Sequence, residues 1–390
     1  MAESNTIPLG ATTAATSRLC FTILCSFVAP IVFAIAVLLY QADPFDPAPF
    51  PADESTNNKV ATAAKINSGM LRESEFIVSG QLFGPEDVAY EPRSRYMYTG
   101  CADGWIKRIN VGESDVDLVV EDWVSTGGRP LGIAIANNGD HVIVADAYKG
   151  LLKITMNKEI SLLTNEAEGK KFMFTDGVDI ARDGTIYFTD ASYKYGFHNY
   201  LNDILEYRPY GRLLSYDNNT RDTKVLLEDL YFPNGVTVSP DQNSLIFCET
   251  PLKKCKTYWI QGSRKGEVDV FIDNLPGFPD NIHSDGQNRY WIAMSSWLNP
   301  YLEQARRYRF VRKSLLIIDR YISIHHIQRN GGILGVDFEG NPTVHVYDPV
   351  MSLITSGIKI EDHLYIGSLN YDHIIRLNLS SLLSPPIEGN

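Results

Sequence analysis

The stretch Phe232-Pro233-Asn234-Gly235-Val236 decides the fold of this chain, because nearly the same turn recurs at Gly84-Pro85-Glu86-Asp87-Val88 and at Phe278-Pro279-Asp280-Asn281-Ile282. Thr175-Asp176-Gly177-Val178 is a looser copy. In each copy an oxygen-bearing side chain stands immediately before a short apolar strand. One polar position that recurs at the same place indicates a repeated structural unit.

The unit itself is a meander of four strands. After Asn234 the chain has β-rich runs at 235–239, 244–249, 255–260 and 267–273, separated by turns rich in Gly, Pro, Asn and Asp. Such punctuation is typical of antiparallel strands joined by tight turns. The order recurs, so that the six predicted units begin near Glu86, Arg129, Asp176, Asn234, Asp280 and Ile354.

A period of about 45 residues with four strands per unit is typical of propeller blades. The sequence therefore predicts an all-β protein, a six-bladed β-propeller of four-stranded antiparallel blades over residues 72–380, followed by a short tail at 381–390. The last unit has only three clear strands. We expect Glu75–Ser79 to supply the fourth, which would close the ring and remove open sheet edges.

An apolar helix is expected before the propeller. Leu19–Tyr40 holds no charged residue, and as a helix this stretch is long enough to span a membrane. Arg18 precedes it and acidic residues follow, so residues 1–18 should be a cytosolic tail and the propeller should lie in the lumen. The stretch 19–40 is either an uncleaved signal anchor or a cleaved signal peptide. Residues 41–71 are expected to be a linker.

Composition restricts the environment and the partners. The chain has 390 residues, of which 44% are hydrophobic, and a net charge of −12, which argues against nucleic acid as a partner. Secretory entry would place it in the endoplasmic reticulum or the vacuole, where Asn218 and Asn378 are candidate glycosylation sites. Cys248 and Cys255 flank a predicted hairpin and are either a disulfide or a pair of buried thiols.

The polar turns should meet in space. In a propeller the first strand of each blade lines the central channel, so the loops that enter these strands converge on the axis. All the converging side chains are hard oxygen donors, which favours Ca²⁺ over zinc or copper. Ordinary turn chemistry is the alternative for Asp176 and Asn234, each of which precedes a glycine. The predicted metal ligands are Glu86, Asp176, Asn234, Asp280 and Asn281.

Further stretches resemble a known family. Gly128–Ile133, Ala145–Leu151, Ile186–Asp190 and Phe232–Gly235 are similar to segments of the strictosidine synthase-like proteins and of adipocyte plasma membrane-associated protein. These belong to the six-bladed calcium propellers that include paraoxonases and gluconolactonase-type enzymes. The resemblance covers about Glu75 to Leu379 and implies a central calcium on the same five residues.

The chain departs from that family at several positions. Where the hydrolases usually have Asn, this chain has Asp176, and the carboxylate of a second calcium site in paraoxonases is replaced by Gly177, although Asp87 is present. The catalytic His of paraoxonases is replaced by Leu131. The Glu that strictosidine synthase uses on its last blade is replaced within Ile354–Ile358, where Thr355 and Ser356 stand. The condensation of an amine with an aldehyde is therefore not expected.

Metal-assisted hydrolysis of esters or lactones is the favoured function. Ca²⁺ would polarise a carbonyl or phosphoryl oxygen, and Asp280 would act as base or nucleophile. Strand alternation points His283 toward the channel as a second candidate base. The rival hypothesis is a catalytically silent propeller that acts as a binding or scaffold protein, which the missing His and Glu favour.

Two insertions should overhang the ligand face. Residues 191–211 carry five tyrosines, and residues 297–331 alternate apolar and basic side chains in a helical pattern. They are either solvated surface, a lid over an aromatic or anionic small-molecule substrate, or a helix on the membrane surface beside the anchor. The basic side chains of the second insertion include Arg306, Arg307, Arg309, Arg312 and Lys313.

Overall fold

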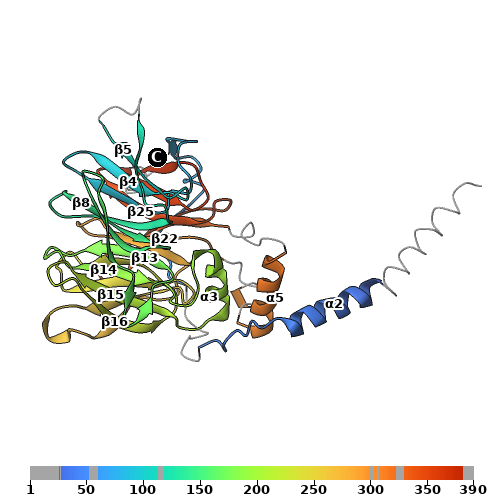
Figure 1. Cartoon of the computed structure of the whole chain (residues 1–390). Coiled ribbons are helices and arrows are strands. Elements are labelled where there is room, and N and C mark those ends of the chain that lie inside the picture. The colour runs from blue at the N-terminus through green and yellow to red at the C-terminus, as the bar shows by residue number, and fades with distance from the viewer. Residues whose placement is uncertain are drawn as a thin grey trace, which may run out of the picture.

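The computed structural model describes residues 26, 28–51, 60–112, 118–297, 303–304, 307–321 and 329–380. Six antiparallel sheets follow one another along the chain, and their inner strands neighbour one another in a closed ring (Figure 1). The prediction of an all-β, six-bladed propeller with four-stranded blades is confirmed. The few helices lie in connections and before the first blade.

The first three blades contain their strands in simple sequence order from the axis outward. Their strands are β3 (Val88–Glu91), β4 (Tyr96–Gly100), β5 (Trp105–Asn110) and β6 (Val120–Ser125), then β7 (Pro130–Ile135), β8 (His141–Asp146), β9 (Gly150–Thr155) and β10 (Ile160–Thr164), then β13 (Thr175–Ile180), β14 (Ile186–Asp190), β15 (Gly211–Asp217) and β16 (Asp222–Leu230). Most residues of the inner three strands are buried, because each blade packs on a neighbour on both of its faces, whereas the outer strands β6, β10 and β16 are largely exposed or half-buried.

The fourth blade repeats this order, and the last two blades recruit strands from the N-terminal side of the propeller. Their strands are β17 (Pro233–Val238), β18 (Ser244–Glu249), β19 (Lys254–Trp259) and β20 (Val268–Ile272), then β21 (Pro279–Ser284), β22 (Tyr290–Met294), β23 (Gly331–Val336) and β24 (Pro342–Asp348), then β25 (Ile354–Ile360), β26 (His363–Ser368) and β27 (Ile374–Asn378).

Two N-terminal strands complete these sheets. β2 (Glu75–Ile77) pairs antiparallel with β27, so the predicted closure of the sixth blade is confirmed. β1 (Lys65–Ser68) adds a fifth, parallel strand to β24. Part of the expected linker 41–71 is therefore a strand of the fifth blade. Its backbone forms hydrogen bonds with the outer edge strand of that sheet, which would otherwise be left unpaired.

The remaining elements are short. They are α2 (Ala29–Ala42), the hairpin β11 (Glu166–Ala167) and β12 (Lys170–Lys171), η2 (Phe197–Asn199), α3 (Tyr200–Glu206), η3 (Gly262–Arg264) and α5 (Arg309–Asp319). Within the described part of the chain, no helix has the length and apolar character needed to cross a membrane. Residues 1–25, residue 27 and residues 381–390 lie outside the described residues. The predicted cytosolic tail 1–18, the beginning of the predicted apolar helix 19–40 and the C-terminal tail are therefore not described.

Glycines let neighbouring inner strands approach each other. A Cβ on Gly177 in β13 would lie 2.6 Å from the carbonyl oxygen of Asn234, and one on Gly235 in β17 would lie 2.6 Å from the Cα of Asn281. Gly132 in β7 stands in the same relation to the carbonyl oxygen of Asp176, at 2.3 Å. A side chain at any of these positions would push the blades apart, so these glycines bring the polar turns together at the axis.

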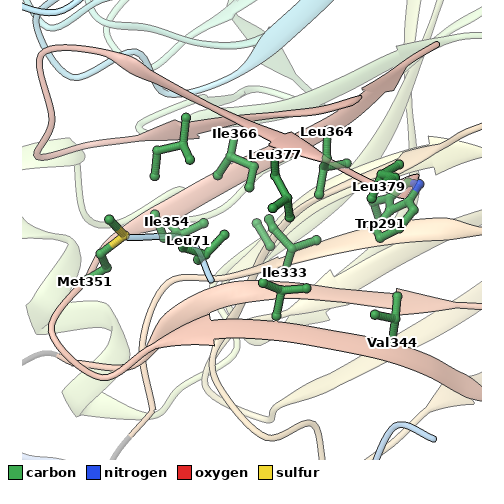
Figure 2. Packing of buried hydrophobic residues seen from close by; sticks show 13 residues of the cluster. Leu71, Trp291, Ile333, Val344, Met351, Ile354, Leu364, Ile366, Leu377 and Leu379 are labelled. Atoms are coloured by element: carbon green, nitrogen blue, oxygen red, sulfur yellow. The ribbon is translucent and has the colours of Figure 1, made fainter. Parts of the chain in front are cut away.

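The hydrophobic core is divided into clusters between successive blades. Figure 2 shows the cluster between the fifth and sixth blades, where Ile333 of β23 and Ile354 of β25 lie beside Leu71. Leu71 is fully buried in the connection between β1 and β2. Burial of such a side chain stabilises the fold by about 1.5 to 3 kcal/mol, so this segment fastens the seam where the ring closes.

The two cysteines of the fourth blade form a disulfide. Cys248 of β18 and Cys255 of β19 are directly opposite each other in the sheet, and their sulfurs are bonded. Of the two alternatives that the sequence left open, the structure has the disulfide. Cys101 is a buried free thiol.

Candidate functional site

The five predicted ligands meet at one end of the channel. They lie just before or at the start of four inner strands, and each is almost fully buried, with 2 to 7% of its surface exposed. A hydrogen bond of 2.7 Å from the Asn281 Nδ2 to the Glu86 Oε1 joins the first and fifth blades across the axis. Their convergence follows from the fold, whereas their role as calcium ligands stays a prediction.

A second, repeated set of acids fixes the entering turns. Asp146, Asp190 and Glu249 each end the second strand of a blade and accept a backbone N–H from the turn that enters the same blade. The donors are the amides of Arg129, Phe174 and Tyr231. Sequence reasoning missed this set. The signal was present as an acidic residue after each apolar run at 142–145, 186–189 and 245–248.

The carboxyl groups of the cluster repel one another. Burial, and then the negative charges of Asp280 and Asp176, raise the pKa of Glu86 well above its usual range. Burial followed by the charge of Asp176 does the same to the pKa of Asp280. Burial and the charge of Asp87 raise the pKa of Asp176 to about 8. The cluster therefore holds protons at neutral pH unless a cation compensates its charge.

The donor set fits a hard divalent cation. Two buried oxygens, the Oε2 of Glu86 and the Oδ1 of Asn234, have no hydrogen-bond partner, and buried oxygens of this kind are normally satisfied. As the side chains stand, no three carboxylates, imidazoles or thiols among the described residues converge closely enough to hold a metal ion. Glu86 is instead bonded to the Asn281 amide, which would have to turn its oxygen inward to act as a ligand.

A satisfied network lies next to this cluster. Asp87 accepts hydrogen bonds from Ser356 Oγ at 2.6 Å and from the backbone of Ile133 at 3.1 Å, and its Oδ1 lies 2.7 Å from His283 Nε2. Burial alone would raise the pKa of Asp87, but the charge and hydrogen bond of His283 lower it overall. His283 is thus engaged with Asp87, and the structure gives it no contact with Asp280.

His283 is held between two carboxylates. Burial would lower the pKa of His283, but the charge and hydrogen bond of Asp87, with the charge of Asp179, raise it overall. The Oδ2 of Asp179 accepts from the backbone of Val238 at 2.7 Å. The positively charged form of His283 is therefore favoured by the two carboxylates on either side of it.

The positions where the chain departs from related enzymes have structural partners. Thr355 donates to the carbonyl oxygen of Glu86 at 2.6 Å, and Ser356 donates to Asp87, so this pair fixes the ligand-bearing turn of the first blade. Leu131 is 2% exposed and packs with Phe174 and Phe232. We call the end of the channel at which the inner strands begin its mouth. The mouth is apolar beside Leu131, and this side chain cannot act as a base.

The first insertion covers this apolar wall. Phe197, Tyr200 and Ile204, from η2 and α3, pack on the cluster that contains Leu131 and Phe174. The connection between β14 and β15 returns to the face where the inner strands begin, so this insertion lies over the mouth as expected. Residues 191–210 also form a polar cluster in which Lys194 donates to Glu206 at 2.8 Å.

Arg129 is a further residue at the mouth that sequence reasoning did not single out. It is 3% exposed and donates to the carbonyl oxygens of Gly84 and Pro130 at 3.1 and 3.2 Å. The Phe197 ring lies 5.5 Å from its guanidinium carbon. Burial lowers the pKa of Arg129, and its charge partly offsets that of Glu86.

The second insertion and the sequons lie on opposite faces. The basic residues Arg309, Arg312 and Lys313 are in α5, which belongs to the β22–β23 connection on the mouth face. Asn218, in the β15–β16 turn, and Asn378, at the end of β27, are exposed on the other face. Arg306 lies outside the described residues.

The fold and the oxygen-lined cluster define a six-bladed propeller with a polar centre at one end of its channel. The family models described as "Strictosidine synthase" and "Strictosidine synthase-like, N-terminal" match residues 176–263 and 68–109. Protein STRICTOSIDINE SYNTHASE-LIKE 6 from Arabidopsis thaliana is 49% identical over 88% of this chain and 92% of its own length. The chain belongs to the strictosidine synthase-like family.

More distant relatives and solved structures agree with the fold. Adipocyte plasma membrane-associated protein from Rattus norvegicus is 34% identical over 80% of this chain and 88% of its own length. A gluconolactonase from Xanthomonas campestris superimposes with a TM-score of 0.56 at 14% identity, over 86% of this chain and 99% of that one. The calcium-binding protein regucalcin from Agrobacterium tumefaciens gives 0.56 at 12% identity, over 80% and 95%. At these identities the structures support the propeller fold alone.

Proposed function

We propose that the protein is a lumenal, calcium-dependent hydrolase of esters or lactones. The observation that carries the proposal is the buried cluster of Glu86, Asp176 and Asp280, in which burial and the charges of neighbouring carboxylates raise the pKa values. Two buried oxygens at the cluster, of Glu86 and Asn234, have no hydrogen-bond partner. Uncompensated acids of this kind destabilise a fold, and such clusters are therefore found mostly at functional sites. Related propellers described as a gluconolactonase and a calcium-binding protein support the proposal.

Five residues would hold the cation: Glu86, Asp176, Asn234, Asp280 and Asn281. When bound, Ca²⁺ would supply a Lewis acid that polarises a carbonyl or phosphoryl oxygen. Asp280 is 7% exposed, the largest value in the set, and is therefore the carboxylate placed best to accept a proton from water or to attack as a nucleophile.

The other residues of the mouth would select and shield the substrate. Leu131, Phe174 and Phe232 give one wall an apolar surface, and Phe197 and Tyr200 cover it from the first insertion. Exclusion of water by this wall would strengthen electrostatic interactions at the cluster. An ester or lactone with an apolar or aromatic acyl part fits these surroundings.

A catalytically silent binding or scaffold propeller is the second candidate. The observation in its favour is that His283, Thr355 and Ser356 all serve internal contacts with the turn of Glu86 and Asp87. A cation at the cluster would then stabilise the ring without chemistry. Amine–aldehyde condensation is not proposed, because the position that would need a carboxylate is occupied by these hydroxyl side chains.

The deciding experiment compares the purified full-length protein with Glu86→Gln on panels of aryl esters and lactones, with calcium and with a chelator. Glu339→Gln, an exposed acid in the β23–β24 turn on the opposite face, is the matched control. The hydrolase proposal predicts turnover that calcium restores, that Glu86→Gln abolishes and that Glu339→Gln leaves unchanged.

The other outcomes are equally informative. Calcium-dependent melting without turnover on any substrate would favour the silent propeller. If calcium changes neither melting nor turnover of the unaltered protein, the calcium site itself is refuted. Digestion with an endoglycosidase would test the lumenal placement, which predicts glycans on Asn218 or Asn378.

A further inference from the structure

We propose that the mouth face of the propeller rests on a lipid bilayer, with α5 lying at the bilayer surface beside α2. The proposal concerns the orientation of the protein and does not depend on the hydrolase function. Figure 1 shows α3, α5 and α2 on the same side of the blades, with α2 extending away from the propeller. Five sets of observations support it.

The segment that follows α2 is fastened to both insertions. Phe45 is buried with Leu205 of α3 and Leu316 of α5. The amide of Ala48 donates to the carbonyl oxygen of Glu206 at 2.8 Å, and Phe50 stacks on Tyr207 with ring centroids 4.6 Å apart. Residues 43–50 are therefore a strap that fixes the end of α2 against the mouth.

Basic side chains of α5 complete the strap. Arg309 Nε donates to the carbonyl oxygen of Pro47 at 2.6 Å, and Lys313 Nζ donates to that of Asp43 at 2.8 Å. The buried Arg312 donates to the carbonyl oxygen of Leu205 at 3.1 Å and so joins α5 to α3. With this many attachments α2 cannot turn freely relative to the propeller, so the membrane position of α2 determines which face approaches the bilayer.

α2 requires an apolar environment that the described protein does not provide. None of its residues is buried, and Ile31, Phe33 and Leu38 are 59, 71 and 64% exposed. Its sequence is apolar on every side rather than along one stripe. That pattern is typical of a helix in lipid, whereas a helix that pairs with a second copy needs only one apolar stripe.

α5 exposes residues that suit the interface between lipid and water. Tyr308, Phe310 and Tyr321 at its two ends are 61, 60 and 72% exposed, and Ile318 is 46% exposed. Aromatic residues of this kind concentrate at the level of lipid headgroups. The side chain of Arg309 is paired with Asp46 but is still 51% exposed, which leaves it able to approach phosphate groups.

A groove joins the two helices at this surface. It has a volume of about 620 Å³, and its lining includes Tyr40 of α2, Phe50 of the strap, and Tyr308 and Phe310 at the start of α5. Aromatic side chains, together with the basic Arg307, Arg309 and Lys313, therefore line one surface from the end of α2 to α5. Both sequon asparagines, Asn218 and Asn378, lie on the face that this orientation turns away from the bilayer.

The test measures which face of the propeller meets the lipid. Full-length protein with Cys20→Ser and Cys25→Ser receives a single accessible cysteine as Phe310→Cys or Tyr321→Cys, a fluorescent label, and reconstitution into vesicles of phosphatidylcholine with a minority of phosphatidylserine. Glu339→Cys is the matched control, because it lies in the same blade but in the β23–β24 turn on the opposite face. Lipids with a spin label in the acyl chain quench nearby fluorophores.

The proposal predicts several-fold stronger quenching at 310 and 321 than at 339. Equal quenching at all three sites would overturn it. Protection of 310 and 321 that depends on protein density and not on spin-labelled lipid would also overturn it, in favour of a second copy on this face. Unchanged melting of each labelled variant ensures that the comparison reports orientation and not unfolding.

Discussion

Glu86 and Asp87 are neighbours in the chain but belong to two different electrostatic environments. Glu86 belongs to the acidic cluster, where repulsion from Asp280 and Asp176 follows burial in raising its pKa and where its Oε2 has no partner. Asp87 is bonded to Ser356, His283 and the backbone of Ile133, and its pKa is lowered. Burial is common to both, so the difference arises from compensation: Asp87 is hydrogen-bonded to its cationic partner His283, whereas Arg129 offsets only part of the charge of Glu86.

The two environments have different roles: the contacts of Asp87 stabilise the fold, and the cluster around Glu86 is the candidate functional site. A buried charge that is fully paired contributes rigidity, whereas breaking such a pair is strongly destabilising. A buried acidic cluster whose charge is only partly offset is a candidate place for a ligand. The paired contacts of Asp87 thus hold the first blade in place, whereas the neighbouring cluster keeps two buried oxygens without a hydrogen-bond partner. Substitutions at the two neighbouring positions should therefore have opposite effects.

The largest effect is expected from Asp87→Asn. At pH 6 the raised pKa of His283 keeps that imidazole charged, so removal of the Asp87 charge should lower the free energy of unfolding by about 3 kcal/mol. Urea denaturation in the presence of a chelator measures it. Glu86→Gln, the same change one residue earlier, should leave the chelated protein as stable or make it more stable. Equal losses in both variants would contradict the comparison.

Glu86→Gln should instead remove the response to calcium. At a calcium concentration of about 100 times its dissociation constant, binding should stabilise the unaltered protein by about 2.7 kcal/mol, and most of this gain should disappear in the variant. Calorimetric melting with and without calcium checks it. Glu339→Gln should keep the full gain, and a full gain in Glu86→Gln would exclude Glu86 as a ligand.

The pH dependence should differ between chelated and calcium-bound protein. The folded pKa of Asp176, about 8, lies above the ordinary value of about 3.9. Its contribution to stability is therefore complete below pH about 4 and is lost as the pH rises through about 8. With a chelator, the melting temperature should fall by roughly 2 to 4 °C between pH 6 and 9. Calcium should suppress most of this fall. A fall that calcium does not reduce would argue against a cation at Asp176.

The smallest effect is expected from Ser356→Ala. This change removes one hydrogen bond to Asp87 and should lower the free energy of unfolding by about 1 kcal/mol, while the calcium response stays unchanged. Denaturation and calcium-induced melting shifts, measured on the same sample, test both parts. A lost calcium response would place Ser356 with the acidic cluster and not with the Asp87 network.

Local sequence was sufficient to predict the blades because each unit repeats its strands, turns and entering polar residue. The closing strand at Glu75–Ile77 could be predicted as well, since the last unit lacked one strand. The five candidate ligands followed from their common position in the repeat. The acids Asp146, Asp190 and Glu249 were also repeated in the sequence but were overlooked.

Other features depend on contacts between distant segments. Nothing local distinguishes Lys65–Ser68 from a linker, because its strand exists only through pairing with β24. Strand alternation predicted that His283 points toward the channel, but its pairing with Asp87 of the first blade depends on how the blades pack and could not be predicted from local sequence. The attachment of residues 43–50 to α3 and α5 is likewise invisible in the sequence, since its partners lie up to about 270 residues away.

The sequence by itself determined the number of blades, the position of the polar turns and the chemistry of their oxygen atoms, because these follow from period and residue type. Only the tertiary structure decided which carboxylates are compensated and which are not. The physical reason is that burial and electrostatic interaction depend on distances between blades. Those distances are fixed when glycines such as Gly177 and Gly235 allow the inner strands to close around the axis.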